Sequence, residues 1–229
     1  MDQAQIRSDL LDQLSELANP EYAQAMQAYM KSEMPFWGVK KPLLKQTLRS
    51  VLADYPKLDW VDARDTAAVL WEEAQHREDL HLALALTGFQ RHRKHLDIGQ
   101  LPFFEAWITQ ASWWDLVDDI AANRLGAMYK TSPGPMSASM RAWAQDDHLW
   151  KRRSAIISQL KRKADCELGL LTDCIEPNIH RTEFWLRKAI GWALRDVGRF
   201  HPEWVVEFVE GHPELSGLSR REAMKHLGK

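Results

Sequence analysis

The chain has 229 residues, of which 45% are hydrophobic and 27% charged. These proportions are typical of a folded globular protein and exclude an intrinsically disordered one. No apolar run approaches the roughly 20 residues of a membrane span, and the first ten residues lack the basic and apolar segments of a secretory signal. Cys166 and Cys174 are too few for a disulfide framework or a four-thiolate zinc site. We expect an intracellular protein with both cysteines reduced and buried.

The net charge of −2 hides an uneven distribution along the chain. Residues 1–149 hold 15 basic against 21 acidic residues, whereas residues 150–229 hold 15 against 11. A polyanionic partner is therefore expected to meet the C-terminal part, although such unevenness also arises by chance. Eleven tryptophans are unusually many. Most are expected in the core, and a few are expected to line a surface.

Helical spacing of apolar residues recurs along the whole chain, and strand-like alternation is almost absent. A first stripe ends before Asn19-Pro20, and a loop interrupts the pattern at residues 35–38. Pro42 can start a helix, and Asp59 is the expected N-cap of the next one. In the N-terminal half, helices are predicted around residues 6–14, 25–29, 42–52, 60–71 and 78–92.

The same spacing continues through the C-terminal half, with a loop predicted at residues 132–135. About a dozen helices joined by short breaks predict antiparallel helix pairs. Pairs that recur every 35–45 residues are typical of HEAT-like repeats. We therefore predict one domain over residues 1–229, an all-α solenoid with a concave binding face. The remaining predicted helices lie around residues 103–107, 112–129, 136–143, 150–163, 168–175, 183–197, 204–209 and 219–227.

The stretch from Ser112 to Asp119 places aromatic rings beside carboxylates. On a helix, Trp114 and Asp118 are four residues apart and share a face, so they suit a cationic guest. Ser112 and Asp115 have the spacing of a capping box, which predicts a local structural role for Asp115. Asp118 has no such role. It is either a functional carboxylate, a solvated one, or the partner of an arginine from another helix.

The predicted helix at residues 150–163 is basic at both ends. Trp150 and Arg153 share a face, and arginine offers a bidentate fork for phosphate. With Lys151 and Arg152 at its start and Lys161 in its second basic cluster, this helix would spread positive charge along a nucleic-acid backbone. The alternative is a solvated polar face.

Lys188, Trp192 and Arg195 fall on one face of the helix predicted at residues 183–197. Gly191 lies within it, where glycine costs about 1 kcal/mol relative to alanine. This cost suggests close approach by another backbone or by a ligand. Tight helix packing around a core tryptophan is the alternative.

Five blocks in order resemble the AlkD-type DNA alkylation repair glycosylases, which are built from HEAT-like repeats. The resemblance runs across nearly the whole chain, with Phe184-Trp185 as a variation on an aromatic pair. The blocks are Tyr29-Met30-Lys31 with Phe36-Trp37-Gly38-Val39 and Pro42; Ser112-Trp113-Trp114-Asp115 with Val117-Asp118; Trp150 with Arg153; Lys188-Ala189-Ile190-Gly191-Trp192 with Leu194-Arg195; and Leu218-Ser219 with Arg221-Glu222-Ala223.

The resemblance implies a DNA glycosylase that excises positively charged N3- and N7-alkylated purines, such as 3-methyladenine and 7-methylguanine, without flipping the base. It implies Asp118 as catalytic carboxylate, Trp114 and Trp192 as aromatic walls, and Arg153 as a phosphate contact. We expect a monomer that binds duplex DNA, is cytoplasmic and nucleoid-associated, and needs no metal, cofactor or membrane. The alternatives are a non-catalytic DNA-structure binder and a protein-interaction scaffold.

Overall fold

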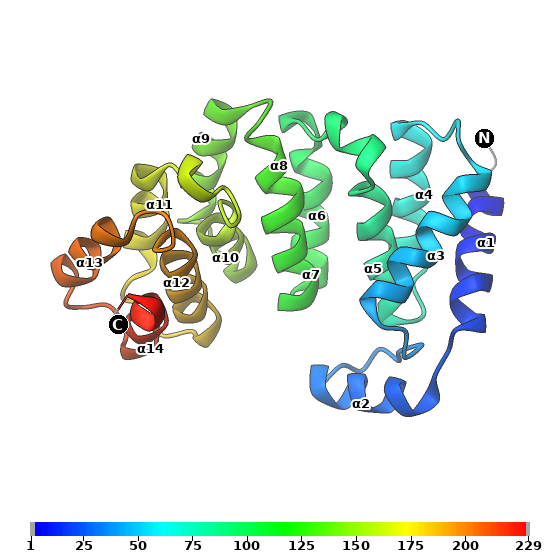
Figure 1. Cartoon of the computed structure of the whole chain (residues 1–229), viewed down its shortest axis with the longest axis horizontal. Coiled ribbons are helices and arrows are strands. Elements are labelled where there is room, and N and C mark those ends of the chain that lie inside the picture. Colours follow the sequence, from blue (N-terminus) through cyan, green and yellow to red (C-terminus); the bar gives the residue numbers. More distant parts are fainter. Residues whose placement is uncertain (1–2, 228–229) are drawn as a thin grey trace. The chain divides into compact units, whose positions relative to one another are not determined.

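The computed structural model describes residues 3–227, and no β-strand occurs within them (Figure 1). This described part contains fourteen α-helices, several short 3-10 segments and one π-helix, which confirms the all-α prediction. The chain divides into two compact units, Met1–His95 and Leu96–Lys229. The expectation of a single domain stays a prediction. None of the helices within residues 3–227 is long and apolar enough to cross a membrane.

The first unit contains five α-helices and a 3-10 segment. α1 packs against α3 and α4, and α4 packs against α5. The expected apolar stripes form this core, with Leu10, Leu14 and Leu48 fully buried. The helix predicted at residues 78–92 ends earlier, at Thr87, and continues as the 3-10 segment Gln90–His95. The helices are α1 (Gln3–Glu16), α2 (Pro20–Met30), α3 (Lys41–Asp54), α4 (Trp60–Glu72) and α5 (Arg77–Thr87).

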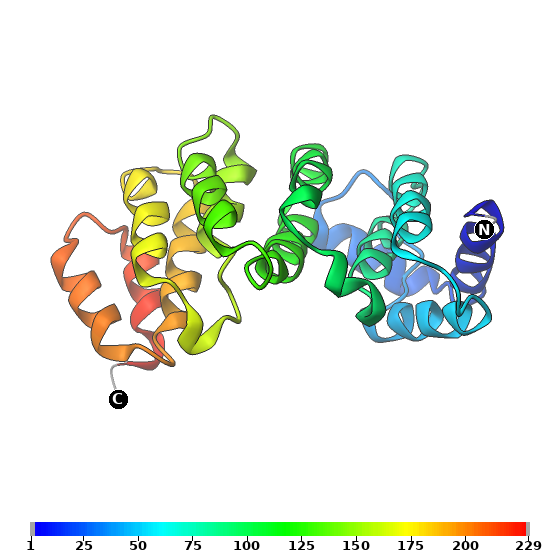
Figure 2. The same ribbon diagram turned by 90° about the horizontal axis from the view of Figure 1, so that it is seen from above.

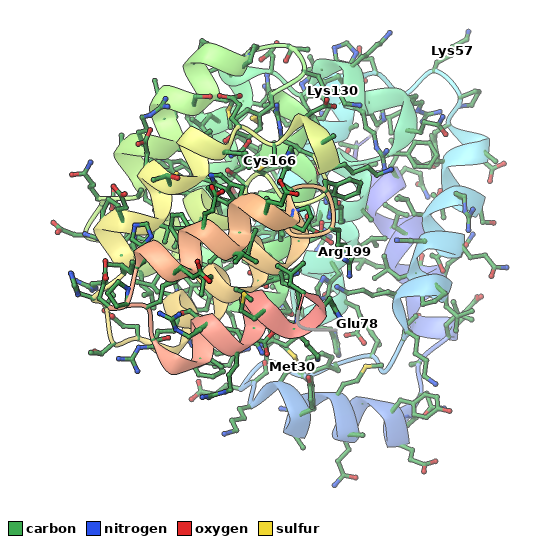
Figure 3. All side chains as sticks on the ribbon, turned by 60° about the vertical axis from the view of Figure 1, so that its left-hand side comes forward. Met30, Lys57, Glu78, Lys130, Cys166 and Arg199 are labelled. Atoms are coloured by element: carbon green, nitrogen blue, oxygen red, sulfur yellow. The ribbon has the colours of Figure 1, made fainter. Side chains whose placement is uncertain are left out.

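A buried glutamate fixes the loop that leads into α3. Glu78, labelled in Figure 3, accepts hydrogen bonds from the backbone N–H groups of Trp37, Gly38 and Val39 at 2.9, 2.9 and 3.0 Å. Gly38 has φ +80°, and a Cβ there would lie 2.1 Å from the Asn19 carbonyl oxygen. The loop predicted at residues 35–38 is thus tied to both α2 and α5, which sets where α3 begins.

The second unit contains the remaining nine α-helices of the described chain. α12 packs between α10 and α14, and the second view shows α14, in red, lying alongside α12 (Figure 2). Both cysteines are free and buried, as expected. The helices are α6 (Leu101–Ala111), α7 (Trp114–Asp119), α8 (Gly126–Met128), α9 (Pro133–Trp143), α10 (Leu149–Ile157), α11 (Leu168–Ile175), α12 (Phe184–Val197), α13 (Pro202–Gly211) and α14 (Gly217–Ala223).

Two predictions for this unit are wrong at element boundaries. The loop predicted at residues 132–135 is largely the first turn of α9, which begins at Pro133. Proline is tolerated there because the first N–H groups of a helix have no intrahelical partner. The helix predicted at residues 150–163 ends at Ile157. Lys161 and Lys163 adopt positive φ values of 72° and 59° that no α-helix continues through.

Tertiary contacts explain why α10 stops early. The Gln159 side chain pairs with the backbone of Glu167 in both directions, at 3.0 and 2.8 Å. The backbone N–H of Lys161 donates to the Asp196 carboxylate at 3.0 Å. The two basic clusters of the sequence therefore do not share one helix.

Candidate active site

The central stretch begins at a sharp turn between two helices. Ser112 ends α6 with φ +41°, and its hydroxyl donates to the Thr109 carbonyl oxygen. Trp113 is the N-cap of α7 and makes no side-chain capping hydrogen bond. The capping box predicted for Ser112 and Asp115 is therefore wrong, because Ser112 belongs to the end of the preceding helix. Asp115 is buried in the first turn of α7.

A wide helical turn directly follows Asp119, the residue after Asp118. α7 ends at Asp119, and residues Ile120–Leu125 form a π-helix that leads into α8. Arg124 pairs with Asp119, five residues away, which matches the spacing of that turn. π-turns are rare and occur frequently at functional sites. The sequence shows no signal for this one.

Asp118 and Arg153 form a bidentate ion pair between α7 and α10. Arg153 donates from Nε to Asp118 Oδ1 at 2.7 Å and from Nη2 to Oδ2 at 2.8 Å. The Asp118 side chain is 13% exposed and the Arg153 side chain is 3% exposed. Burial raises the pKa of Asp118 above its ordinary value, and the hydrogen bonds and charge of Arg153 oppose that rise. Of the alternatives for Asp118, the structure thus shows an arginine partner from another helix.

A backbone carbonyl of a third helix completes the environment of Arg153. Nη1 donates to the Trp185 carbonyl oxygen at 2.5 Å, and the guanidinium lies 5.7 Å from the centroid of the Trp185 ring. Trp185 lies at the start of α12. Helices α7 and α12 therefore hold the guanidinium that α10 carries, and Arg153 is buried rather than at the surface.

Three tryptophans pack together beside this ion pair. The ring centroids are 6.4 Å apart for Trp113 and Trp150, 5.6 Å for Trp113 and Trp185, and 5.8 Å for Trp150 and Trp185. Phe184 meets Trp185 edge-on at 5.1 Å and is 56% exposed. The sequence did not predict that Trp185 contacts Arg153, although Phe184-Trp185 is a variation on the aromatic pair of the family. The cluster meets the Arg153 guanidinium through the Trp185 ring.

Trp114 and Trp192 are partly exposed, on α7 and α12 respectively. Within residues 3–227, neither indole ring stacks on another aromatic ring. Trp114 lies one turn before Asp118 on the same helix, as the spacing predicts. The roles of both tryptophans as walls stay predictions.

Lys151 and Arg152 at the start of α10 have partners within the protein. Lys151 binds Glu105 at 2.7 Å and also Asp146. Burial alone would lower the pKa of Lys151, but these two carboxylates raise it above its ordinary value. Arg152 donates to Asn178 Oδ1 at 3.1 Å and to the carbonyl oxygens of three residues that follow or end α9. Their contact with DNA stays a prediction.

The face of α12 that carries Lys188 and Arg195 meets one carboxylate of α14. Lys188 donates to Glu222 Oε1 at 2.8 Å, and Arg195 pairs with Oε2 of the same residue. A Cβ at Gly191 would lie 2.6 Å from the Glu222 Cβ and 3.0 Å from the Ser219 carbonyl oxygen. Of the alternatives for Gly191, the structure shows close approach of another helix.

Lys161, the remaining predicted DNA contact, is exposed and donates to Asn123 Oδ1 at 2.7 Å. All ten residues predicted for the site lie in the second unit. The structure brings Asp118 and Arg153 together, places Trp150 against Trp185 beside them, and joins Lys188 with Arg195 through Glu222. In the described part of the chain, no group of three or more His, Cys, Asp or Glu side chains is arranged to hold a metal ion.

Comparisons with known proteins agree with this architecture. A family model described as DNA alkylation repair enzyme matches residues 10–227. The structure is similar to a predicted DNA alkylation repair enzyme from Enterococcus faecalis, with 27% identity and a TM-score of 0.82 over 93% of this chain and 97% of that one. It also shares the fold of AlkD2 from Streptococcus mutans, with 18% identity and a TM-score of 0.59 over 81% of this chain and 90% of that one. A comparison with curated proteins found no match. The chain belongs to the DNA alkylation repair enzyme family.

Proposed function

We propose that the protein is a DNA glycosylase that hydrolyses the N-glycosidic bond of cationic N3- or N7-alkylated purines in duplex DNA. The observation that carries this proposal is the largely enclosed Asp118 carboxylate, held at both oxygens by Arg153 in a member of the DNA alkylation repair enzyme family. A carboxylate fixed in this way is pre-oriented, which is what electrostatic catalysis requires.

The chemistry needs little more than such a carboxylate. An alkylated purine already carries a positive charge, so it leaves without a general acid. As the bond breaks, the deoxyribose gains oxocarbenium character, as in other glycosyl transfers. Asp118 stabilises this positive charge and orients the attacking water, whose proton passes to the Asp118 carboxylate as the new C–O bond forms and the neutral alkylated base leaves.

Two partly exposed tryptophans supply the binding energy for the cation. Trp114 and Trp192 present indole rings, which attract a cation by about 0.5–2 kcal/mol each. A base that remains stacked in the duplex avoids the extrusion cost of a few kcal/mol that base-flipping enzymes meet. We include retention of the stacked base in the proposal.

The role of Arg153 follows from its position. Because its guanidinium is buried and bound to Asp118, we propose that Arg153 first positions the carboxylate. The phosphate contact expected from the sequence would require at least one of its N–H groups to leave Asp118 or the Trp185 carbonyl oxygen. Lys188 and Arg195, which are more exposed, are better placed for a phosphate.

The test is direct. The purified protein is incubated with methylated duplex DNA, and the released bases are separated by chromatography. We expect 7-methylguanine or 3-methyladenine to be released and the strand to stay intact with an abasic site. Binding to duplex DNA without release of any base would instead favour a non-catalytic DNA binder on the same scaffold.

A further inference from the structure

Helix α3 of the first unit carries a row of exposed cations. Lys41, Lys45 and Arg49 are four residues apart and all exposed, and we call them the α3 stripe. The opposite side of the helix is core, with Leu44 and Leu48 buried. At 1.5 Å per residue, successive cations lie about 6 Å apart along the helix axis. The stripe is thus a continuous basic face about two turns long.

Acidic residues are absent from the stretch of sequence that contains the stripe. Residues 34–53 contain four cations and no aspartate or glutamate. Within residues 3–227, no carboxylate pairs with any member of the stripe. The Arg49 side chain donates a hydrogen bond from Nε to the Lys45 carbonyl oxygen at 3.3 Å, which is a contact within α3 itself.

The predicted DNA-binding cations of α10 and α12 in the second unit differ from the stripe, because they have partners within the protein. There, Lys151 and Arg153 are paired with carboxylates, Arg152 with carbonyl oxygens, and Lys188 and Arg195 share Glu222. The charge distribution along the sequence predicts that a polyanion binds to residues 150–229. The unpaired basic row lies instead in the N-terminal unit.

The placement of the stripe also opposes helix electrostatics. The N-terminal end of a helix carries a partial positive charge, which favours acidic residues there. α3 has no acidic residue in its first turn and begins with Lys41, and its one acidic residue, Asp54, is the last. The stripe does not stabilise its own helix. An external anion would relieve this repulsion.

We propose that the α3 stripe binds the phosphate backbone of duplex DNA as a sequence-independent contact. The inference rests on the proposed function for the identity of the polyanion. Three cations at intervals of about 6 Å, on long flexible side chains, can each reach a phosphate. Lys40, next to the stripe, is held over the ring of Tyr22 at 4.0 Å, which leaves the three stripe residues as the free cations of this face. Contacts of this kind position a protein on the duplex without reading sequence.

The test compares two triple variants of the full chain that lose the same charge. K41Q/K45Q/R49Q removes the stripe, and K57Q/K94Q/K130Q removes three scattered exposed lysines, of which Lys57 and Lys130 are labelled in Figure 3. Fluorescence anisotropy measures binding to undamaged duplex at several KCl concentrations. We expect the stripe variant to lose about two to three units of the slope of log Kobs against log[salt], because each phosphate contact contributes about 0.9. Thermal melting checks that both variants remain folded.

Base release separates this inference from the proposed function. Single-turnover release from alkylated duplex, at saturating protein, should be equal in the stripe variant and the wild type. An unchanged salt slope in the stripe variant, or an equal loss in the scattered control, overturns the α3 contact while leaving base release intact. Lack of base release by the wild type, together with a reduced slope in the stripe variant, overturns the proposed function and leaves the contact standing.

Discussion

The candidate site depends on the ion pair between Asp118 of α7 and Arg153 of α10. Removing the partner of a buried charge costs about 3–5 kcal/mol, because the remaining charge is desolvated and uncompensated. Arg153 is buried, the Asp118 side chain is only 13% exposed, and Trp185 supplies the third acceptor. Arg153 therefore controls the ionisation of Asp118 as well as its orientation.

A pH profile tests this control. Catalysis needs the ionised carboxylate, and Arg153 lowers a pKa that burial raises. In Arg153→Gln the pKa of Asp118 should rise further, so the acidic limb of the single-turnover rate profile should move to higher pH. Arg153→Lys, which keeps a charge but not the bidentate fork, should give a smaller shift.

The same two variants distinguish the alternative role of Arg153. A profile that stays in place, together with a salt slope of duplex binding reduced by about 1, would show that Arg153 contacts phosphate and does not tune Asp118. Circular dichroism establishes that both variants remain folded before the rates are compared.

Residue types and spacing predicted part of this site. The four-residue interval placed Trp114 and Asp118 on one helix, and an arginine from another helix was among the alternatives for Asp118. The direction of the Arg153 guanidinium was not accessible from sequence, because it is set by Asp118 and Trp185, which lie on two other helices. The Trp185 contribution is a backbone carbonyl, which any residue type would provide.

At the scale of helices, the packing of α12 on α14 is the contact that sets the cationic face. Gly191 lies where a Cβ would meet the Glu222 Cβ at 2.6 Å and Ser219 backbone atoms at 3.0–3.1 Å. Ser219 also donates its hydroxyl to the Arg187 carbonyl oxygen at 2.9 Å. The absence of a side chain at Gly191 lets Glu222 lie between Lys188 and Arg195.

Gly191→Ala should therefore destabilise the protein by about 1–3 kcal/mol, because overpacking outweighs the gain in helix propensity. The free energy of unfolding is measured by urea denaturation. Gly169→Ala in α11 is the matched control, since nothing lies within 4 Å of a Cβ at that position. Equal stabilities of the two variants would contradict the close approach of α14.

The spacing of apolar residues predicted that these helices exist, but it did not predict where several of them end. Leu168–Ile175 was predicted to the residue, and Asp59 caps α4 as expected, accepting from the Asp62 N–H at 2.9 Å. The end of α10 was missed because Asp196 and Glu167, distant in sequence, fix the chain after Ile157. The π-turn after Asp119 has no distinct sequence pattern.

For the whole molecule, net charge is a poor guide to where DNA binds, because partners within the protein neutralise many cations. Glu222 forms ion pairs with both Lys188 and Arg195. Its pKa is lowered mainly by the hydrogen bond from Lys188. Glu222→Gln should leave these two cations with one more unit of net charge. We expect tighter binding to undamaged duplex and a salt slope steeper by about 1.

The control is Glu214→Gln, which changes the net charge equally at an exposed position. Anisotropy titrations across KCl concentrations measure both variants. The same slope for Glu222→Gln and Glu214→Gln would show that Lys188 and Arg195 do not meet the DNA backbone.

The central claim is that Asp118 stabilises the positive sugar during base release. Single-turnover release of 7-methylguanine from alkylated duplex should fall by about 100-fold or more in Asp118→Asn, as for loss of other pre-oriented electrostatic groups. Duplex affinity should stay within about threefold of the wild type, because the Asp118 side chain is only 13% exposed and binds Arg153 rather than a phosphate. Asp147→Asn, an exposed acid before α10, should release the base at the wild-type rate. Full activity in a folded Asp118→Asn variant would contradict the account.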